Sequence, residues 1–116
     1  GMIAFAEALK PNSNFPLALA SLQKLYLYNN QIGDEGMQAF STALSSGALA
    51  SLKTLKLYLN NIGDEGMKAF SSALSSGSLP NIVNLGLSYN QIGDTGMIAF
   101  ADAIKPTDEF PRGPTG

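Results

Sequence analysis

Two pairs of neighbouring carboxylates are the residues best placed to do chemistry, because Asp34-Glu35 and Asp64-Glu65 recur at a spacing of 30 residues. Paired carboxylates can act as a general acid and a general base, or hold a cation. The chain contains no histidine and no cysteine, so the commonest general base and the usual nitrogen and sulfur ligands of metals are missing. At the next recurrence, Thr95 stands where the second carboxylate would be. We therefore expect these residues to cap helix N-termini, and we predict no catalytic residue, no metal site and no cofactor.

Glycines recur beside these carboxylates, at Gly36, Gly66 and Gly96. Glycine-rich segments can cradle phosphates, but here no Lys-Ser/Thr pair follows and the GxGxxG spacing does not occur. We expect instead that these glycines let the start of each helix pack close to a strand.

The composition fits one globular domain and excludes several classes of protein. The chain has 116 residues, of which 45% are apolar and 14% charged, with a net charge of −2. A chain of this size can bury a core without disulfides or metals. No apolar run approaches the roughly 20 residues of a membrane span, and the scattered lysines argue against a nucleic-acid partner. The absence of cysteines and of Asn-x-Ser/Thr sequons favours an intracellular location.

An internal repeat of 30 residues organises the chain, with full units that start at Leu22, Leu52 and Ile82. Such a period is typical of a solenoid, in which each unit buries its apolar face against its neighbours. In the first unit, leucines alternate with Lys24, Tyr26 and Tyr28, which predicts a short strand. The apolar residues from Met37 to Leu44 then follow a helical spacing, and Ser-Ser-Gly ends the helix.

The repeated pattern L-x-x-L-x-L-x-x-N-x-I-G-D-E-G-M-x-A-F-x-x-A-L resembles the ribonuclease-inhibitor-like subfamily of leucine-rich repeat proteins, as found in NOD-like receptors and Ran GTPase-activating proteins. The resemblance recurs three times in register and implies an α/β horseshoe with parallel strands on its concave face and helices on its convex face. It also implies a buried asparagine ladder that satisfies backbone groups. The ladder residues are Asn30, Asn60 and Asn90. A catalytic role for a loop asparagine, as in the Ran GTPase activators, finds no supporting arginine in the repeats.

The array does not begin or end with a complete unit. We expect a leucine-rich repeat segment over residues 1–111, with a partial, helical unit at 1–10 and a long loop at 11–21, followed by an irregular tail at 112–116. Met2 to Pro16 match Met97 to Pro111 at an offset of 95 residues, which suggests a longer parent array. The uncovered first helix should meet a preceding repeat, another copy or a neighbouring subunit. We expect Phe110 to fold back over the last unit as a partial cap.

The strand positions that face away from the core differ between units, and they are where a binding function could reside. In a parallel, in-register sheet, neighbours in a row lie about 4.8 Å apart. The expected rows are Lys24/Thr54/Asn84, Tyr26/Lys56/Gly86, Tyr28/Tyr58/Ser88 and Asn29/Leu59/Tyr89. All four tyrosines of the chain fall here, and tyrosine is enriched at binding hot spots. Tyrosine also simply favours strands and tolerates water. The candidate protein-binding residues are Lys24, Tyr26, Tyr28, Lys56, Tyr58 and Tyr89.

The leading hypothesis is a non-catalytic protein-protein interaction module that binds another protein through the concave strand face. The alternative is a peripheral structural subunit, held by neighbouring subunits of a larger assembly through its ends or its convex helices. An enzyme acting at the carboxylate pairs is disfavoured, because no partner residue for acid-base catalysis accompanies them. No nucleic-acid partner and no insertion into a membrane are expected.

Overall fold

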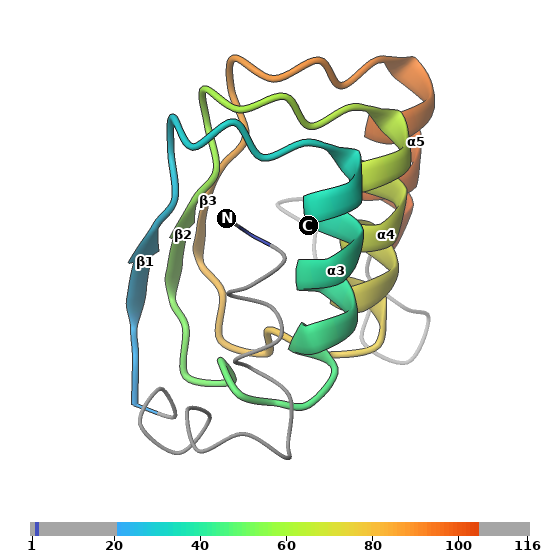
Figure 1. The fold of residues 1–116 in the computed structure, drawn as a ribbon. Coiled ribbons are helices and arrows are strands. Elements are labelled where there is room, and N and C mark those ends of the chain that lie inside the picture. Colours follow the sequence, from blue (N-terminus) through green and yellow to red (C-terminus); the bar gives the residue numbers. More distant parts are fainter. Residues whose placement is uncertain (1, 3–20, 105–116) are drawn as a thin grey trace.

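A computed structural model of the protein describes Met2 and residues 21–104. Strands and helices alternate along the described chain, and the elements are β1 (Lys24–Tyr26), α3 (Asp34–Leu44), β2 (Thr54–Lys56), α4 (Asp64–Ser75), β3 (Asn84–Gly86) and α5 (Asp94–Ala103). The strands form one layer and the helices a second layer beside it (Figure 1). The predicted α/β repeat solenoid is therefore confirmed. Apart from Met2 and Ser21, the predicted partial unit, the long loop, the Phe110 cap and the tail lie outside the described residues.

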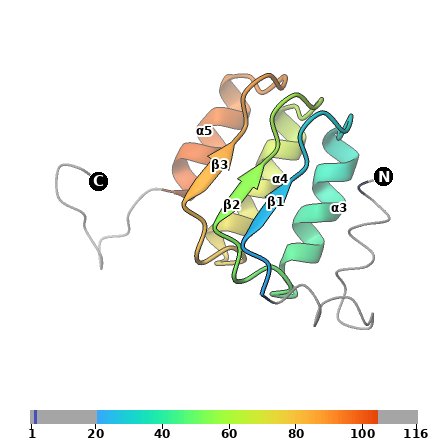
Figure 2. The ribbon, with the colours of Figure 1, turned by 90° about the vertical axis from the view of Figure 1, so that its left-hand side faces the viewer.

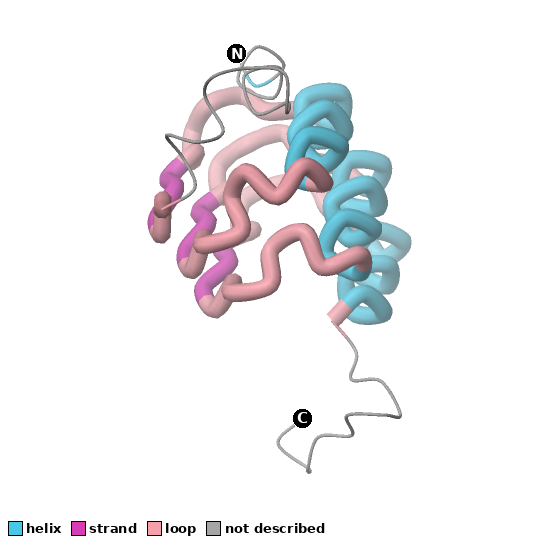
Figure 3. Tube along the Cα trace, turned by 90° about the horizontal axis from the view of Figure 1, so that it is seen from below, coloured by secondary structure: helices cyan, strands magenta, loops and turns pink. Residues whose placement is uncertain are grey.

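The three strands pair in parallel in the order β1-β2-β3. Leu25 lies opposite Leu55, and Leu55 lies opposite Leu85, so the register equals the sequence period. The rows that begin at Lys24 and Tyr26 are thereby confirmed. Seen along the layers, strands line one side and helices the other, joined by loops at both ends (Figure 3).

The core lies between the strand and helix layers and extends through the first and middle units. Leu55, Leu57, Met67 and Phe70 are fully buried, because units on both sides cover them. The helical spacing, repeated in the last unit, predicts that Met97 and Phe100 are core residues as well. Phe100 is half-buried against the core, but Met97 is 45% exposed. The prediction for Met97 was wrong because α5 is the last described helix, and no described element packs against its outer side.

Asp34 and Asp64 do cap helices, but each caps the helix of the next unit. The N-cap residues of the helices are glycines without side chains to donate or accept. Asp34 Oδ1 instead accepts hydrogen bonds from the backbone N–H of Gly63 at 2.7 Å and of Gly66 at 2.9 Å. Asp64 does the same one unit later. The first-turn N–H groups of a helix need acceptors, and here the preceding unit supplies them.

The recurring glycines allow this approach between neighbouring helix starts. A Cβ at Gly66 would lie 2.7 Å from Asp34 Oδ1 and 3.1 Å from Met37 Cβ. The expectation that these glycines bring a helix close to a strand was therefore wrong, because the close neighbour is the start of the preceding helix.

The asparagine ladder forms as expected between units, but it is buried only in its middle. Asn60 Oδ1 accepts from the N–H groups of Asn30 and Ile32, and Asn60 Nδ2 donates to Leu27 O at 3.1 Å and Leu57 O at 2.9 Å. Asn60 is 6% exposed, whereas Asn30 is exposed and Asn90 half-buried. The prediction of a fully buried ladder was wrong at its ends, where a described unit lies on only one side.

Candidate protein-binding surface

The sheet has one face against the helices and one open face. Figure 2 looks onto the open face, with the three strands in front of the helix layer. Because side chains alternate along a strand, the leucines of each strand point into the core and their neighbours point outward. The strand register places Tyr26 beside Lys56 and Lys56 beside Gly86 on the open face.

Three tyrosines gather on this face, and we name Tyr26, Tyr28 and Tyr58 the tyrosine cluster. The rings of Tyr28 and Tyr58 stack with centroids 4.9 Å apart and an interplanar angle of 1°. Tyr26 leans on Tyr28 with a centroid distance of 6.4 Å. Tyr26 is 51% exposed and Tyr28 is 44% exposed, while Tyr58 is half-buried. The cluster is thus held in place by its own contacts while it stays open to solvent.

Lys56 lies beside the tyrosine cluster, over the ring of Tyr26. Its Nζ atom lies 5.4 Å from the centroid of the Tyr26 ring, in the range of a cation–π contact. The tyrosine rings are therefore flanked by a positive charge that remains partly accessible, since Lys56 is half-buried.

Gly86, on β3, leaves room for the stacked rings of Tyr28 and Tyr58. The sequence analysis did not single out this glycine. A Cβ at Gly86 would lie 3.2 Å from Cδ1 of Tyr58. The Tyr58 ring therefore extends across β3 over the Gly86 backbone. A signal was present in the sequence, since Gly86 occupies a row in which the other units carry Tyr26 and Lys56.

The two remaining candidate residues, like Lys56, are not part of the tyrosine cluster. Tyr89 is 78% exposed and makes no ring contact among the described residues. Its φ angle is 58°, and the equivalent Asn29 and Leu59 are also left-handed, at 57° and 61°. This turn after the strand breaks the alternation that holds the other tyrosines in rows. Lys24 is exposed on the open face one row before Tyr26.

Charges separate between the two layers of the described chain. Three of its four lysines lie in or directly before strands, whereas Lys68 lies on α4 and pairs with Glu65 at 3.2 Å. The lysines of the strand layer are Lys24, Lys53 and Lys56. All described acidic residues lie in helices, and they are Asp34, Glu35, Asp64, Glu65, Asp94 and Asp102. The strand layer is therefore positive even though the whole chain carries a net charge of −2.

Three of the four carboxylates in the repeated pairs have hydrogen-bonding partners. The carboxylates of Asp34 and Asp64 accept backbone N–H groups, and Glu65 pairs with Lys68. Within the described residues, no group of three or more acidic side chains is arranged to hold a metal ion. Among the described helices, none has both the length and the apolar character that crossing a membrane requires.

The repeats match a known protein family. A family model described as a leucine-rich repeat matches residues 18–41, 48–71 and 78–101, which together make up more than half of the chain. Each matched stretch begins before a strand and ends within the following helix. No curated protein matches the chain.

Proposed function

Because the chain belongs to the leucine-rich repeat family, we propose that it is a protein-interaction module that binds a protein partner through the open, concave face of its sheet. Leucine-rich repeats are commonly protein-interaction modules, and the family match gives the general role. The tyrosine cluster carries the proposal for this particular face, because the rings of Tyr28 and Tyr58 are stacked 4.9 Å apart on the open face and Tyr28 is 44% exposed.

The geometry of the cluster suits binding. Each tyrosine offers a flat apolar body and a polar tip, and aromatic anchors of this kind dominate the energetics of many interfaces. Rings that already hold one another in place lose little conformational freedom when a partner docks. We further propose that Lys24, Lys56 and Tyr89 extend the contact surface around the cluster, and that the partner presents acidic groups toward the lysines.

A photocrosslinking experiment tests the face directly. A photoreactive phenylalanine analogue replaces Tyr26 in the protein, which is then irradiated in the cells that produce it. The expected result is a crosslink to one defined protein. The same analogue at Gln38, an exposed position on α3, is the matched control and should not capture that protein. Equal capture from both positions would contradict the proposal.

The captured partner then allows a quantitative test. Tyr28→Ala combined with Tyr58→Ala should weaken its binding about thirtyfold or more, since loss of a hot-spot aromatic costs about 2 kcal/mol or more. The melting temperature should change little, because both rings lie on the open face. Ser72→Ala, on the exposed side of α4, is the control that should bind normally. A partner that binds the double variant as tightly as the wild type would overturn the role of the cluster.

We propose no catalytic role for the chain. Of the paired carboxylates, Asp34 and Asp64 already accept backbone N–H groups, and Glu65 pairs with Lys68. Within the family, we assign the chain to the ribonuclease-inhibitor-like subfamily. The repeat of 30 residues and a regular helix of 10 to 12 residues in each unit support this assignment.

One observation favours the alternative role, a peripheral subunit held through its ends. The last unit exposes Met97, Ile98 and Ile104, which are 45%, 63% and 54% exposed. Footprinting of the natural assembly separates the two functions: protection of Tyr26 and Tyr28 supports the open face, whereas protection of Met97 and Ile104 supports an end-held subunit.

A further inference from the structure

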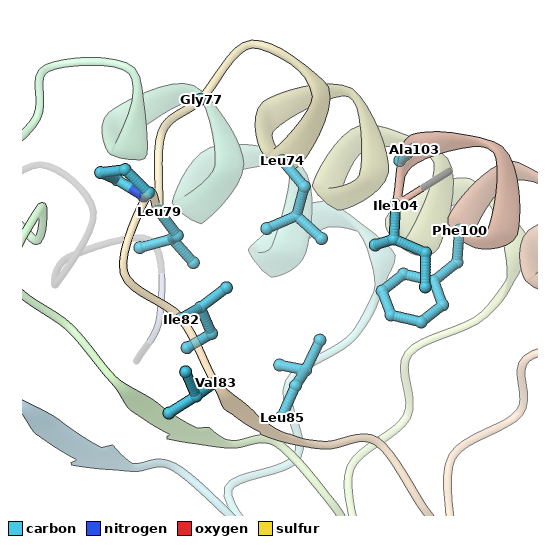
Figure 4. Close-up of a pocket in the computed structure, with 10 residues that line it drawn as sticks. Leu74, Gly77, Leu79, Ile82, Val83, Leu85, Phe100, Ala103 and Ile104 are labelled. Carbon is cyan, nitrogen blue, oxygen red and sulfur yellow. The ribbon is translucent and has the colours of Figure 1, made fainter. Parts of the chain in front are cut away.

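The outer side of the last unit has the composition of a core face. We define the end face by five residues that are half-buried or exposed. The middle-unit equivalents of four of them are fully buried, whereas Leu74, the equivalent of Ile104, is half-buried. The end face consists of Leu85, Ile92, Met97, Phe100 and Ile104. Beside it, a cavity of about 430 Å³ opens between the segment that leads into β3 and the last turn of α5. Leu85, Phe100 and Ile104 line this cavity together with Leu74 (Figure 4).

The carboxylate at the end face, Asp94, is equivalent to two aspartates that join neighbouring units inside the array. Asp34 and Asp64 each accept two backbone N–H groups from the start of the next helix, over 2.7 to 3.0 Å. Asp94 occupies the same position on α5, and no described residue donates to it. The end face thus offers a carboxylate with the acceptor geometry for one more helix start.

The opposite end of the array presents the complement. The N–H groups of Gly33 and Gly36 at the start of α3 have no carboxylate acceptor among the described residues, although the equivalent glycines of α4 and α5 have one. The outer edge of β1 likewise has no strand partner within the described sheet. Each end therefore has the groups that the other lacks.

A second observation shows which sequence the α3 end accepts. Met2 lies against α3, and its Cβ is 3.2 Å from the place of a Cβ on Gly36. Inside the array, Met37 Cβ lies 3.1 Å from the same place on Gly66, so Met2 holds the position of a preceding unit's methionine. Residues 2–6 read Met-Ile-Ala-Phe-Ala, and residues 97–101 of α5 have the identical sequence. The face of α3 that holds Met2 thus suits Met97 equally well.

From these two observations we propose that the end face binds the β1/α3 end of a second copy of the chain, head to tail. In this contact Met97 of one copy takes on α3 of the next copy the place that Met2 holds. Asp94 accepts the N–H groups of Gly33 and Gly36, and β3 pairs with β1 as β2 pairs with β3. Met97 replaces Met2 there, and the second copy adds Asp94 and β3 to the contact. The two surfaces differ, so the contact is heterologous and can continue beyond a dimer.

Light scattering over a range of concentrations gives the first test. The mass of the 116-residue chain should rise with concentration. Asp94→Lys should weaken association about tenfold or more, because it removes a charged acceptor and places a cation at a helix N-terminus. Glu65→Lys changes the net charge equally at an exposed position within the array and should leave association unchanged. A mass that stays monomeric at every concentration, or equal effects of both variants, would overturn the proposal.

Disulfide trapping tests the register of the contact. The chain has no native cysteines, so any disulfide must join the introduced ones. Asp94→Cys protein is mixed with Gly33→Cys protein and oxidised, and a mixed dimer should accumulate. A Cβ at Gly33 meets no atom within 4 Å, so the substitution fits. The pair Asp64→Cys and Gly93→Cys in one chain is the geometric control, because a Cβ at Gly93 lies 3.7 Å from Asp64 Cγ.

The matched negative control for trapping is Ser72→Cys, an exposed position on α4, mixed with the same Gly33→Cys protein. Mixed dimers with Asp94→Cys should exceed those with Ser72→Cys at least severalfold. If the control pair within one chain closes but the two mixtures give equal yields, the head-to-tail contact is wrong.

Discussion

The middle and last units of the array share a sequence pattern but differ in how their residues are covered. Met67 and Phe70 are fully buried, whereas Met97 is 45% exposed and Phe100 is half-buried. Asp64 bonds to the start of the following helix, whereas Asp94 has no donor among the described residues. The difference shows that a residue's role in a solenoid is set by its neighbouring units as much as by its own unit.

The largest effect should come from the buried phenylalanine. Phe70→Ala removes a fully buried ring and should lower the free energy of unfolding by about 3 to 5 kcal/mol, because it opens a cavity in the core. Phe100→Ala removes a half-buried ring and should cost about half as much. Urea denaturation of the two variants measures the difference. Equal losses at low protein concentration would show that the last unit is covered in the monomer.

The ladder asparagines come next. Asn60→Leu leaves two N–H groups and two carbonyls of neighbouring turns without their partner, at a cost of about 3 kcal/mol. Asn30→Leu at the exposed end loses a bond to Tyr28 O and should cost less than about 1 kcal/mol. The midpoints of chemical unfolding compare the pair. An Asn60→Leu variant of wild-type stability would contradict the ladder.

Replacing the aspartates at the helix starts should lower the free energy of unfolding by a smaller amount. Asp64→Ala removes the acceptor for Gly93 and Gly96 N–H and should cost about 1 to 2 kcal/mol. Asp94→Ala should change stability by less than about 0.5 kcal/mol at concentrations where the chain is monomeric. Thermal unfolding at low concentration measures both. If Asp94→Ala were as destabilising as Asp64→Ala, Asp94 would have to cap a group within its own chain.

The smallest effect should have the opposite sign. Leu59 adopts a left-handed φ of 61°, at the position that Asn29 occupies in the first unit. Asparagine adopts this conformation more readily than leucine, so Leu59→Asn should stabilise the fold by about 0.5 to 1 kcal/mol. The exposed leucine side chain loses little burial in the exchange, since it is 47% exposed. Differential scanning calorimetry checks the direction, and a lower melting temperature would refute it.

Much of the fold follows from local rules that the sequence states directly. The alternation around Leu25 predicts a strand, and the spacing from Met37 to Leu44 predicts a helix, because each pattern puts apolar side chains on one face. The fixed period then dictates a parallel register, since equivalent residues of neighbouring units must lie side by side. The tyrosines at 26, 28 and 58 could be assigned to one face for the same reason.

The contacts between units could not be predicted from the periodicity within a unit. That Asp34 caps α4 and not its own helix depends on how closely two helix starts approach, which the tertiary packing at Gly66 decides. The stack of Tyr28 on Tyr58, the space above Gly86 and the separation of Tyr89 by a left-handed turn also depend on three-dimensional placement. The sequence by itself determined the strand, the helix and the repeat, because these follow from periodicity within a unit. Only the tertiary structure decided burial and hydrogen-bond partners, because both depend on the unit that lies alongside.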